Sequence, residues 1–105
     1  MKLILAIVQH EDSTKLTEAL TKNKINVTNL ASTGGFLRAG NVTFMIGTEE
    51  DQVESVLEII KNKCKSRTEV TTPAPMYMGA SAWPVEVVVG GATVFVMDVD
   101  RFEKV

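Results

Sequence analysis

Apolar residues follow one another along this chain in two kinds of pattern, one typical of strands and the other of helices. The run at residues 3–8 is continuous rather than alternating, which predicts a strand with both faces buried. Residues 25–31 are rich in β-branched side chains and predict a second strand. A third strand is predicted over residues 42–46, and Gly47 is either its terminator or a place where a ligand approaches the backbone closely.

Two helices are predicted between the strands. The first is short and amphipathic, with capping and acidic groups at residues 11–13, and it fades by Asn23. The second begins with a capping-box pattern at residues 48–51, in which the Thr48 hydroxyl would cap the helix. Its apolar stripe has helical spacing and consists of Val53, Val56, Leu57, Ile60 and Cys64.

Regular patterning stops after residue 65 for about twenty residues, a length that predicts a lid, a binding loop or a disordered insert. Residues 85–89 and 92–97 then flank Gly90 and Gly91, which predicts a hairpin or a bulged strand.

The order of these elements is two split βαβ units, which predicts an α+β, ferredoxin-like sandwich formed by a single domain over residues 1–105. Both helices would cover one face of its sheet. The strands at 3–8 and 94–97 carry no polar alternation, so the opposite face would also be apolar. We therefore expect other copies of the chain to cover that face, with a cyclic trimer as the natural closed arrangement.

Composition and charge narrow the class of protein. The chain has 105 residues, of which 45% are hydrophobic and 23% charged, as in one folded domain. Its longest apolar run is too short to cross a bilayer, and its single cysteine suits a reducing cytoplasm, so we expect a cytoplasmic protein. The net charge of −2 argues against nucleic acid polymers and anionic membranes as partners.

The densest cluster of chemically useful residues lies in the loop at 32–41. Its glycines and hydroxyls can turn backbone N–H groups toward an anion. Phe36 and Leu37 offer apolar surface against which a base can stack, and Asn41 can donate to and accept from a purine edge. The alternative interpretation is a glycine-rich connection with a packed phenylalanine, but two apolar residues in the middle of such a loop favour a ligand.

The sequence lacks the residues needed for a metal site, for a catalytic cysteine and for the usual nucleotide-binding loops. His10 is the only histidine and Cys64 the only cysteine, so no metal-ligand set is expected. Cys64 lies on the apolar stripe of its helix and is expected to be a core residue rather than a nucleophile. The glycine-rich motifs of the usual mononucleotide and dinucleotide sites are absent.

Three stretches of the sequence, MKLILAIVQ at 1–9, TGGFLRAGNVTF at 33–44 and VGGATVFVM at 89–97, resemble the bacterial PII-like cyclic di-AMP receptors of the PstA or DarA type. The resemblance covers essentially the whole chain. It implies a PII-like homotrimer that binds cyclic di-AMP in the clefts between subunits, needs no cofactor, has no enzymatic activity and signals to a downstream protein. It also implies a short loop between the second and third strands, around 38–41, and an enlarged loop before the last strand.

The resemblance implies a set of ligand contacts consisting of Thr28, Gly35, Phe36, Leu37, Asn41, Gly47 and Phe95. Members of the family can carry arginine where this chain has Asn26, which can hydrogen-bond but cannot offer a charged fork to phosphate. Lys104 is a further candidate. Ligand binding is expected to order the Arg38 loop, the loop at 65–84, or both.

Two other functions compete with this interpretation. A small ferredoxin-like phosphohydrolase could use Arg38 to bind phosphate and Asn41 to orient water, but no general base accompanies them. An RNA-binding sheet needs aromatic residues on central strands among basic residues, whereas the central strands here are aliphatic.

Overall fold

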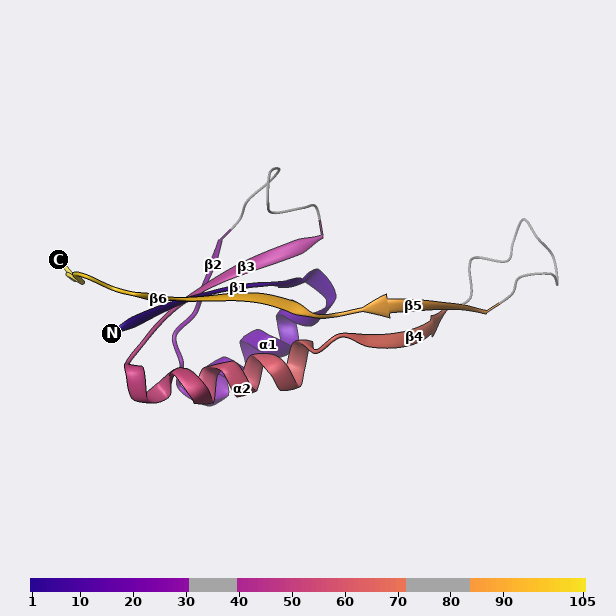
Figure 1. Ribbon diagram of the computed structural model, residues 1–105, viewed down its shortest axis with the longest axis horizontal. Helices are drawn as coiled ribbons and strands as arrows, with labels where there is room; N and C mark the ends of the chain where they lie inside the picture. Colours follow the sequence, from indigo (N-terminus) through magenta and orange to yellow (C-terminus); the bar gives the residue numbers. More distant parts are fainter. Residues whose placement is uncertain (31–39, 72–83) are drawn as a thin grey trace.

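The computed structural model of the chain describes residues 1–30, 40–71 and 84–105 (Figure 1). In chain order its elements are β1 (Lys2–Gln9), α1 (His10–Lys22), β2 (Thr28–Leu30), β3 (Asn41–Thr48), the 3-10 turn η1 (Glu50–Gln52), α2 (Val53–Cys64), β4 (Arg67–Thr71), β5 (Val85–Val89) and β6 (Ala92–Asp98).

Four strands form an antiparallel sheet in the order β2-β3-β1-β6, with β1 hydrogen-bonded to both β3 and β6. Helices α1 and α2 both lie on one face of this sheet (Figure 1). Strand, helix and strand follow one another twice, as β1-α1-β2 and β3-α2-β6. This mixed α+β arrangement is compatible with the ferredoxin-like, PII-like fold that the sequence predicts.

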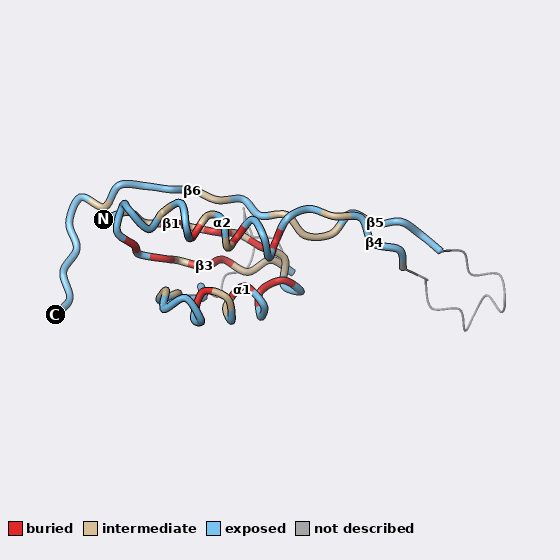
Figure 2. The backbone as a smooth tube through the Cα atoms, turned by 90° about the horizontal axis from the view of Figure 1, so that it is seen from below, coloured by how far each residue is buried: buried red, intermediate tan, exposed pale blue. Residues whose placement is uncertain are grey.

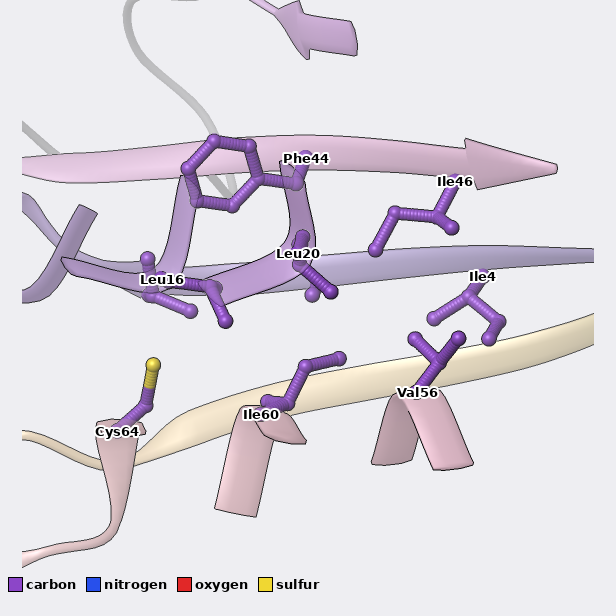
Figure 3. Close-up of a cluster of buried hydrophobic side chains, with 10 residues drawn as sticks. Ile4, Leu16, Leu20, Phe44, Ile46, Val56, Ile60 and Cys64 are labelled. Carbon is purple, nitrogen blue, oxygen red and sulfur yellow. The ribbon is translucent and has the colours of Figure 1, made fainter. Parts of the chain in front are cut away.

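The hydrophobic core lies between the sheet and the two helices. Side chains of α1 and α2 point toward the sheet and meet the alternate residues of β1 and β3 that face them (Figure 3). The fully or nearly fully buried core residues are Ile4, Ala6, Val8, Leu16, Leu20, Phe44, Ile46, Val56, Ile60 and Cys64. The apolar stripe predicted for the second helix is therefore confirmed, and Cys64 is a core residue as expected.

The other face of the sheet is apolar too, but it is not buried within one chain. Since side chains alternate along a strand, the residues between the core positions of β1, β3 and β6 point away from the helices. This set, which we call the open face, includes Leu3, Leu5, Ile7, Met45, Phe95 and Met97. The prediction that the first strand is buried on both faces thus holds for only one face in a single chain.

Strands β4 and β5 pair with each other and form a two-stranded arm that projects beyond the four-stranded sheet (Figure 1). The prediction of irregular chain directly after residue 65 is wrong for Arg67–Thr71, which form β4. The predicted hairpin of 85–89 with 92–97 is also wrong, because β5 pairs with β4 whereas β6 pairs with β1. At Gly90 and Gly91, between β5 and β6, the chain passes from one sheet to the other.

Three local predictions are corrected at the ends of elements. Gly47 does not end β3, which continues to Thr48, and Gly47 pairs with Leu3 of β1. No capping box forms at Thr48, because the chain first makes η1 and the N-cap of α2 is Gln52. The second strand is shorter than predicted, since β2 begins at Thr28.

The start of α1 also differs from the prediction. Its N-cap residue is Gln9, and Asp12 and Ser13, which the sequence suggests as helix-start groups, lie inside the helix and are buried. The Ser13 hydroxyl donates to the His10 carbonyl oxygen at 2.6 Å instead of capping the helix.

Candidate ligand-binding site

A pocket of about 410 Å³ lies at one end of the four-stranded sheet and contains three of the residues singled out from the sequence, Asn26, Thr28 and Gly47. Its volume is in the range of small-molecule sites. The remaining lining residues are apolar and consist of Met1, Leu3, Met45, Val99 and Phe102.

The pairing of three strands brings these residues together. Thr28 of β2 lies opposite Met45 of β3, and Gly47 of β3 lies opposite Leu3 of β1. Met45 and Gly47 are two residues apart and alternate with the core residue Ile46, so both lie on the open face. Asn26 precedes β2 by two residues and is exposed at the rim.

Gly47 leaves the backbone of β3 uncovered at the floor of this pocket. A Cβ atom placed there would have the Met1 Cε as its nearest neighbour, at 3.8 Å, which is an ordinary van der Waals contact. A side chain at position 47 is therefore tolerated by the fold, and its main effect is to occupy space in the pocket.

Asn41 lies at the opposite end of β3 from Gly47. It pairs with Gln9 and lines a separate pocket of about 360 Å³ beside Gln9, Gly90 and Gly91. At the rise of an extended strand, the six residues from Asn41 to Gly47 span about 20 Å. The structure therefore does not bring Asn41 into the same pocket as Asn26, Thr28 and Gly47.

Phe95 lies between these two ends. It belongs to β6, opposite Leu5, and 44% of its surface is exposed on the open face. Gly35, Phe36, Leu37 and Arg38 lie outside the described residues, and Lys104 lies in the exposed segment after β6.

The structure also shows a buried charge at a residue that the sequence suggests only as a helix-start group. Asp12 of α1 is fully buried and accepts hydrogen bonds from Arg67 of β4, at 2.9 Å from Nη2 and 3.3 Å from Nη1. The Lys15 Nζ lies 3.3 Å from the same carboxylate. The Arg67 guanidinium, with help from Lys15, holds the pKa of Asp12 below its usual value. This ion pair joins α1 to the base of the arm.

A sequence signal for this pair exists. Asp12 lies four residues before Leu16 and eight before Leu20, on the buried stripe of α1. An acidic residue on an apolar stripe requires a buried partner. The sequence does not show that Arg67 is that partner, because β4 has no recognisable pattern.

Two hydrogen bonds from backbone amides also fix the base of the arm. The Gly90 amide donates to the Gln9 side-chain oxygen at 2.7 Å, and the Gly91 amide donates to the Cys64 carbonyl oxygen. Gly90 and Gly91 both have positive φ, at 81° and 91°. The junction between β5 and β6 is thus tied to the start of α1 and to the end of α2.

Burial raises the pKa of the Cys64 thiol to about 11, which keeps it protonated and unreactive at neutral pH. Among the described residues no group of three or more His, Cys, Asp and Glu side chains is placed to hold a metal ion. The helices in the described part of the chain are too short or too polar to cross a membrane.

A ligand-sized pocket at the edge of an apolar sheet face is a feature typical of small-molecule-binding proteins. The family of cyclic-di-AMP receptors matches residues 1–105, the whole chain, and the chain therefore belongs to this family. The resemblance drawn from the sequence is thus confirmed.

A solved structure supports the fold. The crystal structure of a functionally unknown protein from Pediococcus pentosaceus is 45% identical in sequence to this chain, with a TM-score of 0.80. The match covers 99% of this chain and 96% of that protein.

Proposed function

We propose that the protein is a bacterial, cytoplasmic signal-transduction receptor that binds cyclic di-AMP between the subunits of a homotrimer. The observation that carries the proposal is the pocket that gathers Asn26, Thr28 and Gly47 at the edge of the open face. The family to which the chain belongs supports cyclic di-AMP as the ligand.

The chemistry of the ligand matches the residues. Cyclic di-AMP carries two negative charges and two adenines. The Thr28 hydroxyl and the backbone amides around Gly35 can bind the phosphates without a large basic patch, which agrees with a net charge of −2. Asn41 suits an adenine edge, and Phe36, Leu37 and Phe95 suit adenine faces.

The separation of about 20 Å between the ends of β3 favours a site shared by two chains. In such a site one subunit contributes the pocket at Gly47 and its neighbour contributes Asn41. The apolar open face supports the same arrangement, since other copies of the chain would remove it from water.

Binding would signal by changing the order of the loops. The short loop around 38–41 between β2 and β3 and the enlarged loop at 65–84 before β6, whose described part includes β4, are the segments that a downstream protein would contact. A ligand at 100 times its dissociation constant stabilises the bound state by about 2.7 kcal/mol. Amide hydrogen exchange should therefore slow in one or both loops when cyclic di-AMP is added, and unchanged exchange in both would contradict this mechanism.

Calorimetric titration of the protein with cyclic di-AMP, cyclic di-GMP and ATP tests the proposal. We expect saturable heat with cyclic di-AMP, and chromatography should recover the messenger intact after incubation. Recovery of a hydrolysed product would instead support the phosphohydrolase alternative.

The substitution Gly47→Val tests whether the ligand lies in this pocket. The added side chain would occupy the pocket next to Met1 without a backbone clash, so binding should weaken by tenfold or more while the protein stays folded. Val88→Ala, on the arm and away from the pocket, is the control, and its affinity should equal that of the unaltered protein. Equal affinity of the Gly47→Val protein would contradict the proposed position of the ligand.

A further inference from the structure

One aromatic residue lines the pocket without any role in the proposal so far. Phe102 belongs to the segment that follows β6, and 64% of its surface is exposed. This segment leaves the end of β6 and runs past the ends of β1 and β3, on the side of the sheet away from the helices (Figures 1 and 2). Its start is fixed to the first residue of the chain, because the Val99 amide donates to the Met1 carbonyl oxygen at 3.2 Å.

The pocket has two chemically different parts. Its floor is formed by Leu3 and Met45 of the open face, next to the bare backbone of Gly47. Phe102 and the exposed Asn26 complete the lining, the first with an aromatic ring and the second with a carboxamide. A mostly apolar pocket with an aromatic ring and one carboxamide among its lining residues fits a planar heterocycle that has hydrogen-bonding groups along its perimeter.

The Asn26 side-chain amide favours one heterocycle, adenine. An asparagine side chain donates and accepts at the same time, and it pairs in this way with the N6 and N7 atoms of adenine. The matching edge of guanine presents two acceptors, which arginine and lysine satisfy and asparagine does not. Asn26 is therefore suited to adenine and poorly suited to guanine.

We propose that this pocket is an adenine slot, in which Phe102 stacks on the base and Asn26 hydrogen-bonds to its edge. The inference rests on the proposed function, since the adenine is that of cyclic di-AMP. In this arrangement Phe102 and Asn26 recognise the base. The Thr28 hydroxyl and the Gly47 backbone then contact the phosphate and ribose of the same ligand.

The test is the affinity for cyclic di-AMP of three variants. Phe102→Ala should weaken binding about 5- to 150-fold, because stacking on an aromatic ring contributes about 1–3 kcal/mol per base. Phe102→Tyr keeps the aromatic face and should stay within about threefold of the unaltered protein. Asn26→Leu, which has a similar shape but no hydrogen-bonding groups, should also weaken binding.

Two further measurements separate base recognition from a structural effect. If Phe102 and Asn26 hold the same base, the double variant should lose less affinity than the two single losses combined. Val105→Ala is the matched control on the same segment, where its exposed side chain does not line the pocket, and it should bind normally. The melting temperature of Phe102→Ala should be unchanged because the ring is mostly exposed.

The possible outcomes distinguish the two proposals. If the unaltered protein gives no heat with cyclic di-AMP, the proposed function fails and this inference fails with it. If the unaltered protein binds and Phe102→Ala binds equally well, only the adenine slot is overturned. Full additivity of the double variant, or a loss of affinity in Val105→Ala equal to that in Phe102→Ala, would overturn it as well.

Discussion

Asp12 and Arg67 are the residues whose chemistry departs most from that of a solvated surface. The carboxylate is fully buried, whereas the Arg67 side chain keeps 29% of its surface exposed. Removing one partner of a buried ion pair lowers the stability of the fold because the other charge stays buried without a counter-charge. Here Lys15 would remain beside Asp12 and reduce this loss of stability.

We predict that Arg67→Met lowers the free energy of unfolding by about 2 kcal/mol at pH 7. This loss is smaller than for an ion pair that is buried on both sides, because the Arg67 guanidinium is partly hydrated. The pKa of Asp12 is lowered in the folded protein, so its stabilising effect is complete above the unfolded pKa near 4. That effect is lost as the pH falls through the lowered pKa. The difference in the free energy of unfolding between the unaltered protein and Arg67→Met should therefore be smaller at pH 3 than at pH 7.

Urea unfolding at pH 7 and pH 3 measures both quantities. The control is Arg101→Met, because Arg101 pairs with Glu103 on the exposed C-terminal segment and 77% of its side-chain surface is accessible. Its effect should stay within about 0.5 kcal/mol at both pH values. A loss of stability in Arg67→Met that stays constant with pH would show that the pair with Asp12 is not its cause.

At the scale of elements, the junction between β5 and β6 requires glycine for two separate reasons. Both Gly90 and Gly91 adopt positive φ, which side chains rarely tolerate. At Gly90 a Cβ atom would also lie 2.5 Å from the Arg67 Nη1 and 2.7 Å from the Lys65 carbonyl oxygen. At Gly91 the nearest atom would be 3.8 Å away.

The two glycines therefore form a matched pair for substitution. Gly91→Ala should destabilise the protein by about 1–2 kcal/mol, through backbone strain alone. Gly90→Ala should cost about 1–3 kcal/mol more, because the Arg67 side chain and the Lys65 backbone must move apart. The free energies of unfolding of the two variants in urea measure this difference, and equal values would contradict the close packing at the base of the arm.

Elements with a continuous apolar stripe can be predicted from the sequence, and elements stabilised by a distant partner cannot. Helix α2 follows from its spacing of apolar residues, and β1 from its unbroken run. In β4 the charged residues Arg67 and Glu69 alternate with a threonine and a single valine, so no apolar face is visible in it. Its strand conformation depends on hydrogen bonds to the valine-rich β5. Even the pair nearest in sequence, Thr71 with Val85, is fourteen residues apart, which is beyond the reach of local patterns.

The same distinction applies to the candidate site. The resemblance supplies Asn26, Thr28 and Gly47, and the structure places them in one pocket. Phe102 has no distinguishing pattern, because its position depends on where the segment after β6 runs relative to the end of the sheet. The separation of Asn41 from Gly47, by contrast, already follows from the predicted strand at 42–46, which has these two residues at its opposite ends.

At the scale of the whole molecule, the most unusual feature is the apolar open face. Buried residues concentrate in β1, β3 and the helices, whereas β6 and the arm are largely exposed (Figure 2). Leu5 lies at the centre of the open face, between Met45 of β3 and Phe95 of β6. A charge at this position would be buried without a partner in any assembly that covers the face.

We predict that Leu5→Glu sediments as single folded chains, whereas the unaltered protein sediments at three times the chain mass. The control is Val88→Glu, on β5 of the arm, where 71% of the surface is exposed, and it should sediment like the unaltered protein. Circular dichroism verifies that both variants are folded. An unaltered protein that sediments as single chains would contradict the proposed trimer directly.

The distance between the two ends of β3 has a consequence for how a cell would use such a receptor. When no lone polypeptide holds the whole set of contacts, the response depends on how much receptor has been synthesised as well as on how much messenger is present. In the proposed shared site, added messenger would find few complete sites well below the abundance at which chains associate. Near that abundance the messenger would itself favour association, so expression level and second-messenger concentration would act jointly as the input.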